Sequence, residues 1–383
     1  MEYLRTYAKI HLDNVGRNVD GVKAKIPDGT RVMAVIKANA YGHGATALAE
    51  YLKDKVDWFG VATLDEALEL RAAGAEKDIL VLGCLNECEF ESAVKGNITV
   101  AIADLARAEK LSAVATSLGI TAKVHIKVDT GMSRIGFQVT KASVSDVVRI
   151  KELPGIYLEG MFTHFAIADA RDKTSALAQR EKYDWFVEEC RKANVEIPIC
   201  HINNSAATME MDRHYDMVRM GIMLYGLYPS EEMDKSYELY PAMEIISHIS
   251  FIKPLEKGRG VSYGHTFVTK KDTLVATVQC GYADGYPRCL SGKSEVLVSG
   301  VRCPVLGRIC MDQMMVDISA VPHAKVGDEV VLVGFDGEEH IPVEEVADAA
   351  HSFNYEFVCG VAPRVPRAYF EGENHTKTVK YLV

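Results

Sequence analysis

Arg31-Val-Met-Ala-Val-Ile-Lys37-Ala-Asn-Ala-Tyr41-Gly-His-Gly44 joins a buried strand to a lysine and a short glycine-rich turn. The five apolar residues from Val32 to Ile36 predict the strand, and a helical pattern begins at Ala45, directly after the turn. A strand, a turn and a helix in this order form the repeating unit of α/β folds.

Lys37 stands at the carboxyl end of this strand, where a lysine is unfavourable unless its charge is removed or used. The commonest productive use is a Schiff base with an aldehyde, because desolvation lowers the pKa of the amine and makes its nitrogen nucleophilic. The alternative is a lysine whose stem follows the strand while its charge reaches water. The spacing alone leaves both interpretations open.

The composition excludes several classes of protein. The chain has 383 residues, enough for two domains of ordinary size, and 48% of the residues are hydrophobic. Its 43 basic and 53 acidic side chains give a net charge of −10, and no basic block stands out. We therefore expect neither a nucleic acid nor an anionic membrane surface as a partner.

The nine cysteines show no zinc-site spacing, and several lie inside apolar runs, as Cys200 and Cys280 do. This pattern is typical of reduced, buried thiols in a cytoplasmic protein. The 12 histidines are scattered and include no H-E-x-x-H pair, so we expect no metal site. The first residues contain no apolar run of the signal-peptide type, and no run reaches the length of a membrane span.

Short apolar runs alternate with amphipathic stretches over the first 224 residues or so. The predicted strands are 32–37, 57–62, 79–83, 98–102, 123–128, 157–163, 199–203 and 217–220. The predicted helices are 45–53, 64–73, 86–95, 104–118, 141–152 and 174–193. Thr63, with Glu66 three residues later, predicts a capping box at the start of the second helix.

Eight strand-then-helix units predict a (β/α)8 TIM-type barrel. The rival is a doubly wound open sheet, which would need a G-x-G-x-x-G turn that the sequence lacks. Beyond about residue 240, short strand candidates separated by Gly, Pro and Asp turns predict a smaller, mostly β domain. We expect the barrel to comprise residues 12–238 and the β-rich domain residues 239–383, with residues 1–11 pairing with the latter.

The active site of such a barrel lies at the carboxyl ends of its strands. Polar residues gather there, namely Lys37, Lys127, His164, Asn204, Ser205 and Arg219. Ser205 at a helix start and Gly221 after the last strand suit a phosphate. The same pattern at the helix start is also typical of an ordinary N-cap. Arg134, in a loop between two glycines, suits a small carboxylate that it can grip with two hydrogen bonds.

The segment around Lys37 closely resembles the cofactor-lysine signature of alanine racemases, which use pyridoxal 5′-phosphate (PLP). Further motifs follow in the order of that family: Val-Asp-Thr-Gly-Met-Ser-Arg-Ile-Gly-Phe, Thr-His-Phe-Ala, Asn-Ser-Ala-Ala, Val-Arg-Met-Gly-Ile, Val-Ser-Tyr-Gly, Gly-Tyr-Ala-Asp-Gly and Gly-Arg-Ile-Cys-Met-Asp-Gln. Because these motifs cover nearly the whole chain, the resemblance is specific. It implies an isomerase that interconverts L-alanine and D-alanine and supplies D-alanine for peptidoglycan.

The resemblance also implies a role for each matching residue. Lys37 would hold PLP and act as one base, and Tyr263 from a partner chain would act as the other, so that a homodimer shares its active sites. Arg219 would face the pyridine nitrogen and leave it unprotonated, because an arginine barely gives up its proton. His164 would bridge Arg219 and Tyr263.

The remaining positions fall into three groups by the same resemblance. The phosphate would be bound by Tyr41, Asn204, Ser205, Gly221, Ile222 and Tyr355, and the substrate carboxylate by Arg134 and the partner's Met311. Lys127, at a position that is carbamylated in some members, would support Arg134, and Tyr282 and Asp312 would also be supporting residues. The channel that leads to the site would be lined by Asp169, Arg288, Arg308 and Phe353.

Three alternatives stay open. A racemase for serine would share these motifs, although relatives that act on serine tend to differ near Tyr355 or Met311, which this chain keeps. A PLP-dependent decarboxylase would usually place an acidic residue at the pyridine nitrogen, where this chain has Arg219. A protein that only holds PLP would resemble the first domain alone.

Overall fold

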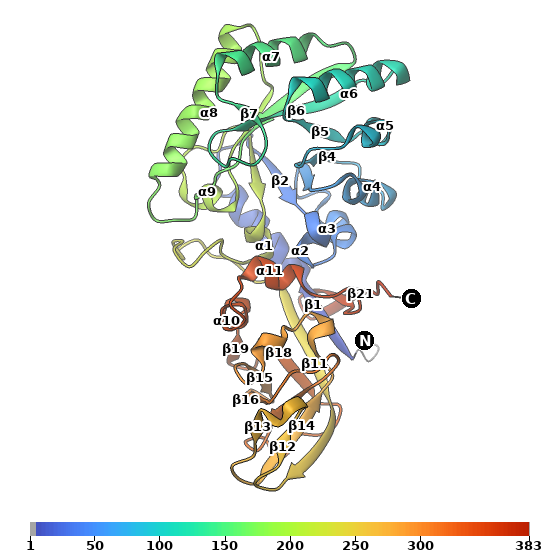
Figure 1. Cartoon of the computed structure of the whole chain (residues 1–383), viewed down its shortest axis with the longest axis vertical. Helices are drawn as coiled ribbons and strands as arrows, with labels where there is room; N and C mark the ends of the chain where they lie inside the picture. The colour runs from blue at the N-terminus through green and yellow to red at the C-terminus, as the bar shows by residue number, and fades with distance from the viewer. Residues whose placement is uncertain (1–4, 383) are drawn as a thin grey trace. The chain divides into compact units, whose positions relative to one another are not determined.

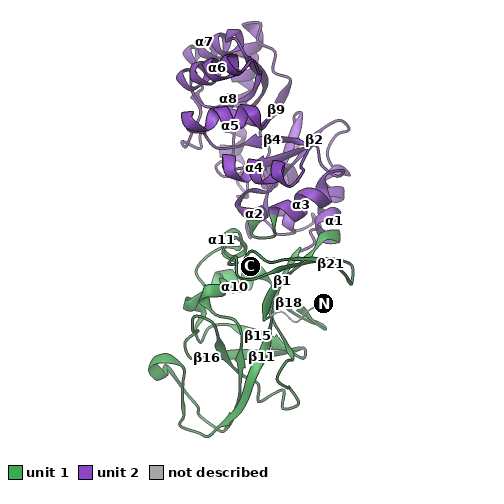
Figure 2. Ribbon diagram, turned by 90° about the vertical axis from the view of Figure 1, so that its right-hand side faces the viewer, with its two compact units in different colours: residues 1–13, 41–44, 241–383 green, residues 14–40, 45–240 purple. Residues whose placement is uncertain are grey.

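The computed structural model describes residues 5–382, and the chain forms two compact units (Figure 2). The first unit, here called the barrel unit, comprises residues 14–40 and 45–240. The second, here called the β unit, comprises residues 5–13, the turn Tyr41–Gly44 and residues 241–382, and the part of the expected 1–11 pairing that falls on residues 1–4 lies outside the described residues. The chain therefore contributes two short segments from its first 44 residues to the β unit.

The barrel unit confirms the predicted (β/α)8 architecture (Figure 1). Eight parallel strands follow the order β10-β2-β3-β4-β5-β6-β8-β9. Their bounds are Met217–Met220, Arg31–Val35, Trp58–Val61, Asp78–Val81, Thr99–Ile102, Ala122–Asp129, Ile156–Phe162 and Ile199–His201. The first and last strands of this order meet and close the barrel. The Arg219 amide donates to the Asn203 carbonyl oxygen at 3.1 Å, and the Asp216 amide donates to the Cys200 carbonyl oxygen at 3.0 Å.

Helices connect the strands and lie outside them (Figure 1). They are α1 (Leu12–Lys23), α3 (Ala45–Leu52), α4 (Leu64–Ala72), α5 (Phe90–Lys95), α6 (Leu105–Leu118), α7 (Lys141–Glu152), α8 (Thr174–Lys192) and α9 (Ser205–Glu210). The capping box predicted at Thr63 and Glu66 is confirmed at the start of α4. The strands carry apolar side chains on both faces, as in other strands that helices cover, and all four residues of β3 and of β5 are buried.

Two features of the barrel unit differ from the sequence-based expectations. The first strand, β2, ends at Val35, so Lys37 is two residues beyond it rather than its last residue. Helix α1 was not predicted, although Leu12, Val15, Val19 and Val22 are spaced as on one helix face and all are buried. Two glycines and two asparagines lower its intrinsic helix propensity, and tertiary burial of this face compensates for them.

The β unit is built around one sheet of ten strands, as the predicted β-rich domain requires. The strand order is β19-β18-β15-β16-β17-β14-β11-β1-β20-β21. The bounds in chain order are β1 (Thr6–His11), β11 (Met243–Leu255), β14 (Thr273–Val278), β15 (Glu295–Val298), β16 (Val301–Leu306), β17 (Met314–Asp317), β18 (Glu329–Asp336), β19 (Glu339–Ile341), β20 (Arg367–Glu371) and β21 (Asn374–Val379). Two short strands, β12 (Gly260–Val261) and β13 (Phe267–Val268), form a separate hairpin.

Strand β1 is integral to this sheet, since it pairs antiparallel with β11 and parallel with β20. Two short helices, α10 (Val343–Ala349) and α11 (Asn354–Cys359), precede the last two strands. Across residues 5–382, the structure contains no helix with the length and apolar character that crossing a membrane would need.

Candidate active site

Lys37 opens a single left-handed turn, the segment labelled α2 (Lys37–Tyr41) in Figure 1. Ala38, Asn39, Ala40 and Tyr41 all have φ between 51° and 54°. Left-handed backbone costs about 1–2 kcal/mol for each residue that carries a Cβ atom, so four such residues in a row need strong support. Backbone strain of this kind is concentrated at functional sites.

Hydrogen bonds from neighbouring segments stabilise this turn. The Ala38 amide donates to Glu66 Oε1 at 2.6 Å, and the Ala45 amide donates to Asn39 Oδ1 at 2.8 Å. Glu66 Oε2 accepts from the Ala62 amide at 2.7 Å, so one carboxylate joins the turn to the end of β3. Glu66, which the sequence suggests only as part of a capping box, therefore also holds the backbone beside Lys37.

Arg219, on β10, has neutral partners throughout the part of the chain that the structure describes. Its Nη2 donates to the carbonyl oxygens of Thr163 and Ile202, each at 2.9 Å, and to His164 Nδ1 at 3.2 Å. Its Nη1 donates to His201 Nδ1 at 3.1 Å. Burial lowers the pKa of Arg219 to about 10, which leaves the guanidinium charged at neutral pH. Among the described residues, no carboxylate contacts this buried cation.

His164 follows β8 and lies where several cations converge. Burial first, and then the charges of Arg219, Arg134, Lys127 and Lys37, lower the pKa of His164 well below its usual value. The imidazole is therefore neutral, and since Arg219 donates to Nδ1, its proton is on Nε2. These four cations come from three strand ends of one barrel, those of β2, β6 and β10, which makes this end of the barrel suited to an anion.

Lys127 lies inside the barrel with only 2% of its surface exposed. Its Nζ donates to the Val128 carbonyl oxygen at 2.9 Å and lies 5.5 Å from the centre of the Phe162 ring. Burial, helped by the charge of Arg219, lowers the pKa of Lys127 to about 8. A sizeable share of this amine is therefore neutral near physiological pH.

Arg134 is presented by the loop after β6, and its side chain is exposed. Asp129 Oδ1 accepts from the amides of Gly131 and Ser133, each at 3.0 Å, and so fixes the start of the loop. Gly136 closes the loop with φ +126°, where a Cβ atom would lie 2.7 Å from the Asp129 amide nitrogen. The two glycines that flank Arg134 in the sequence thus shape the loop that presents it.

The segment that follows β9 joins the segment that follows β10. Asn204 caps α9 by accepting from the Ala207 amide at 3.0 Å, so the plain helix-cap reading holds for this residue. The neighbouring Ser205 Oγ accepts from the Gly221 amide at 3.0 Å. Ile222 is fully buried beside them. A hydroxyl and backbone amides gathered at a helix start are the donor set that a phosphate requires.

Tyr263 belongs to the β unit, where it is 68% exposed. The preceding residue, Ser262, has φ 62° and ψ −173°, a conformation that is essentially restricted to glycine. The Ser262 hydroxyl donates to the Arg308 carbonyl oxygen at 2.5 Å. The exposed phenol is thus presented by a strained backbone that a side-chain hydrogen bond holds in place.

Tyr282, Met311 and Asp312 belong to two adjacent loops of the β unit. The amides of Tyr282 and Ala283 donate to the carbonyl oxygens of Cys310 and Met311 at 3.1 and 3.0 Å. A Cβ atom on Gly281 would lie 2.3 Å from the Cys310 carbonyl oxygen, so only glycine allows this approach. The two loops therefore form one body, with 51% of Met311 and 40% of Tyr282 exposed.

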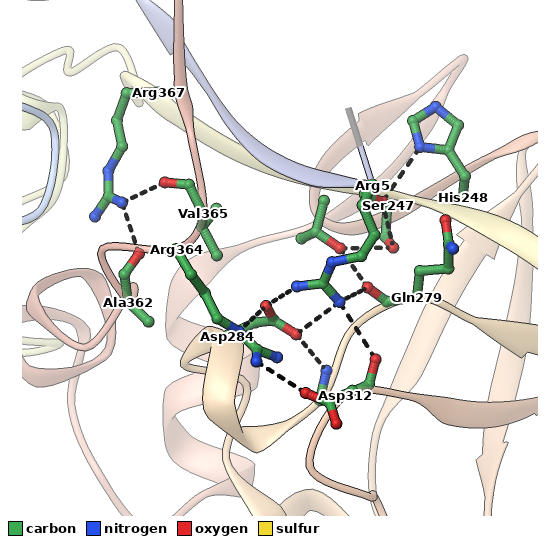
Figure 3. Close-up of polar contacts among 12 residues, drawn as sticks. Arg5, Ser247, His248, Gln279, Asp284, Asp312, Ala362, Arg364, Val365 and Arg367 are labelled. Carbon is green, nitrogen blue, oxygen red and sulfur yellow. Dashed lines mark hydrogen bonds and ion pairs between the residues drawn. The ribbon is translucent and has the colours of Figure 1, made fainter. Parts of the chain in front are cut away.

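A buried carboxylate anchors this pair of loops (Figure 3). Asp284 forms ion pairs with Arg5 and with Arg364, and the Asp284 side chain is 1% exposed. Arg364 also donates to Asp312 Oδ1 at 2.8 Å, and Arg5 to the Asp312 carbonyl oxygen at 3.3 Å. No local pattern in the sequence indicates this arrangement, because its members lie in separate segments that only folding brings together, with Arg5 and Asp284 279 residues apart.

Tyr41 and Tyr355, the two tyrosines expected at the phosphate, both belong to the β unit. Their ring centres are 6.1 Å apart, and Phe353 lies 5.4 Å from Tyr355. Arg288 and Arg308 are exposed in this unit, as is Phe353, whereas Asp169 is half-buried in the barrel unit. The expected site residues thus form one set in the barrel unit and a second set in the β unit.

Two family profiles match the chain. The profile "Alanine racemase, N-terminal domain" matches residues 10–229, and "Alanine racemase, C-terminal domain" matches residues 242–369. The chain belongs to the alanine racemase family. Its members are isomerases, and the match extends over both units.

Individual relatives agree with the family profiles. "Alanine racemase 1" of Clostridium acetobutylicum is 40% identical over 379 residues, which cover 98% of each chain. A solved alanine racemase structure from Clostridium difficile 630 is 42% identical, with a TM-score of 0.96 and full coverage of both chains. Another, from Bacillus anthracis with bound L-Ala-P, is 34% identical, with a TM-score of 0.94 and coverage of 100% and 99%.

Proposed function

We propose that this protein interconverts L-alanine and D-alanine with PLP as its cofactor, and that Lys37 and Tyr263 act as the two bases. The observation that carries the proposal is the environment of Arg219, a buried cation with neutral partners at the phosphate-suited end of the barrel. PLP enzymes of other reaction classes usually place an acidic residue at the pyridine nitrogen. The absence of any carboxylate contact to Arg219 among the described residues favours racemisation.

The residues of the barrel unit fit PLP by their chemistry. Lys37 Nζ would bind the aldehyde carbon covalently, Ser205 with the amides of Gly221 and Ile222 would bind the phosphate, and Arg219 would donate to the ring nitrogen. When bound, PLP withdraws electrons from the substrate and thereby acidifies the hydrogen on its α-carbon. Arg219, which barely gives up its proton, would leave the ring nitrogen unprotonated and would thereby disfavour transamination.

The protein moves one proton on each face of the substrate. Lys37 Nζ removes or returns the α-proton on one face, and Oη of Tyr263 of the partner subunit does so on the other. His164 carries its own proton on Nε2 and can therefore donate to that phenol oxygen, which would tune its basicity. Arg134 would hold the substrate carboxylate, and the amide of the partner's Met311 would support it.

The exposure of the second set supports a homodimer with shared sites. Tyr263, Tyr282, Met311 and Phe353 are between 40% and 68% exposed in the single chain. Exposed aromatic and methionine side chains of this size usually mark an interaction surface. We place the dimer in the cytoplasm, where its D-alanine would supply peptidoglycan synthesis, and regard the relative with bound L-Ala-P as support for a small amino-acid substrate.

The proposal is tested by incubating L-alanine with the PLP-loaded protein and following optical rotation. We expect the rotation to decay to zero while D-alanine forms and neither pyruvate nor carbon dioxide accumulates. Serine, tested in parallel, should turn over more slowly, although one small pocket difference changes such a preference only about 10- to 200-fold. Persistent rotation with intact cofactor absorbance would contradict the proposal.

A further inference from the structure

A row of buried polar side chains crosses the inside of the barrel behind Arg219. His125 on β6 and His201 on β9 are fully buried, and Glu159 on β8 is 7% exposed. The proposed function assigns no task to His125 or Glu159. Buried titratable groups are unfavourable unless their partners compensate them, so their arrangement needs an explanation.

The row runs from Arg219 through both imidazoles toward Glu159. Arg219 Nη1 lies 3.1 Å from His201 Nδ1, and His201 Nε2 lies 2.9 Å from His125 Nδ1. His125 Nε2 in turn lies 3.5 Å from Glu159 Oε2, which is close enough for attraction by the carboxylate charge but lacks hydrogen-bond geometry. Four side chains from four different strands thus form one path between a buried cation and a buried carboxylate.

Arginine fixes the direction of every proton along this path. Because a guanidinium can only donate, His201 Nδ1 must be the acceptor and its proton must be on Nε2. That proton is donated to His125 Nδ1, so the proton of His125 is also on Nε2, where the Glu159 carboxylate lies 3.5 Å away. Burial lowers the pKa of both histidines, which keeps each imidazole neutral with a single proton.

Glu159 is held ionised at the far end. Burial acts to raise the pKa of Glu159, but His125, Thr99 and Lys123 together lower it below its usual value. The Thr99 hydroxyl donates to Oε2 at 2.9 Å, and Lys123 Nζ lies 3.7 Å from Oε1. An ionised carboxylate accepts but cannot donate, so it favours the same proton positions as Arg219 does.

The packing of the strands is adapted to this row. In the pairing of β6 with β8, Val124 is opposite Leu158 and His125 is opposite Gly160, so Glu159 is the extra residue of a β-bulge. A bulge re-aims the side chain that it carries. A Cβ atom on Gly160 would lie 2.6 Å from the His125 ring, and the Phe162 ring stacks on His201 at 5.0 Å.

We propose that Glu159 and His125 are positioning residues for Arg219, which they orient through His201 by fixing the tautomers of both imidazoles. The inference rests on the proposed function only in the task that it gives to Arg219. If either imidazole carried its proton on Nδ1 instead, an N–H group of His201 would face an N–H group of Arg219. Arg219 would then have to turn, and the ring nitrogen would lose its donor.

The tautomers can be measured in the wild-type protein without any substitution. Solid-state 15N NMR of protein labelled in its histidine side chains separates neutral Nε2–H, neutral Nδ1–H and charged rings. We expect His125 and His201 to be neutral and protonated at Nε2, whether or not the protein holds PLP. The signals of His125 are assigned as those that disappear in His125→Gln. A charged ring or an Nδ1–H tautomer at either histidine would overturn the proposal.

Glu159→Gln tests the effect on Arg219. The amide keeps the shape of the carboxylate, but its NH2 group can donate to His125 Nε2, so the reverse order of protons becomes accessible. We expect a second His201 tautomer and a rise on the order of tenfold in pyruvate formed per racemisation event, at nearly unchanged KM for alanine. The control is Ser112→Ala, which removes a partly buried hydrogen bond, 2.6 Å long, from Ser112 Oγ to the Pro154 carbonyl oxygen, two groups that are not members of the row.

The outcomes separate this inference from the proposed function. The inference is supported if the wild-type tautomers are as expected and if Glu159→Gln changes the His201 tautomer and raises pyruvate formation. Ser112→Ala should do neither. Unchanged tautomers, or equal pyruvate in both variants, overturn the inference. If the wild-type protein does not racemise alanine, the proposed function fails while the NMR measurement still decides the order of protons.

Discussion

The guanidinium of Arg367 is 1% exposed and donates from Nε to the Gly42 carbonyl oxygen at 2.8 Å. Its other nitrogens donate to the carbonyl oxygens of Val361, Ala362 and Val365, so this buried cation has four neutral acceptors (two of them drawn in Figure 3). Tyr369 Oη donates to the next carbonyl oxygen of the turn, that of His43, at 3.0 Å. The turn that begins with Tyr41 is therefore built into the β unit.

Replacing Arg367 with Met should destabilise the protein and weaken its affinity for PLP. Four backbone carbonyl groups would lose a charged donor, so we expect the free energy of unfolding to fall by about 3 kcal/mol or more. Because Gly42 is one of the four, Tyr41 would lose its fixed position. Denaturant unfolding and PLP titration measure the two effects. Tyr369→Phe, which removes one neutral hydrogen bond to the same turn, should cost about 1 kcal/mol.

At position 262 a glycine variant should be more stable than an alanine variant, which is the reverse of the usual order of stability. At ordinary positions a protein with Ala is more stable than one with Gly by about 0.4–1 kcal/mol. The backbone conformation of Ser262, however, is strained by about 1–3 kcal/mol for any residue that carries a Cβ atom. Both variants lose the hydrogen bond to Arg308, so we expect Ser262→Gly to be more stable than Ser262→Ala in thermal unfolding. Greater stability of the alanine variant would show that the strain is absent.

Removing the phenol of Tyr263 should stop racemisation but spare half of the proton exchange. L-alanine and D-alanine are mirror images with equal free energy, so kcat/KM must stay equal in the two directions in any variant. The informative measurement is therefore proton exchange in D2O, followed by NMR and mass spectrometry. We expect Tyr263→Phe to exchange the α-proton of one enantiomer only, whereas Lys37→Ala should lose cofactor absorbance and activity together.

Lys127 should make stability depend on pH in buffer free of carbon dioxide. Its pKa falls from 10.5 to about 8 on folding, so the unfolded chain binds the proton more tightly. Below pH 8 this costs about 3 kcal/mol of stability, and the cost disappears as the pH rises from about 8 to 10.5. Lys127→Met should therefore be more stable than wild type at pH 7 and lose that advantage at high pH.

The same lowered pKa favours carbamylation, because only a neutral amine attacks carbon dioxide. Adding 13C-bicarbonate near pH 8 should produce a carbamate carbon signal in the 13C NMR spectrum of the wild-type protein and none in Lys127→Met. The adduct would replace a cation beside Arg134 with an anion that can brace it. Absence of the signal would leave Lys127 as an unmodified amine.

Asp284→Asn should be far more damaging than a similar change at the surface. Breaking a buried ion pair costs about 3–5 kcal/mol, and Asp284 pairs with both Arg5 and Arg364. Because Arg364 also holds Asp312, the loop with Met311 should loosen and the KM for alanine should rise more than kcat falls. Glu345→Gln, which weakens the exposed pair with Arg302, should cost less than about 1 kcal/mol.

Much of the barrel could be predicted because its signals are local. Each run such as Val32–Ile36 is apolar over strand length, and caps such as Thr63 mark where a helix begins. Strand ends in a barrel converge by geometry, so Lys37, His164 and Arg219 could be expected together before any distance was known. The missed helix α1 has weak local propensity and depends on the burial of one face.

The sequence by itself determined the order of strands and helices, the fold class and the kinds of side chain at the strand ends. Only the tertiary structure decided how these side chains are held: the left-handed turn after Lys37, the bulge at Glu159 and the strained backbone of Ser262. Each of these opposes local preference and persists through contacts with residues remote in the chain, such as Glu66 for the turn and Arg308 for Ser262. Local propensity is a sum over neighbours along the chain, whereas these conformations are stabilised by partners that folding alone brings near.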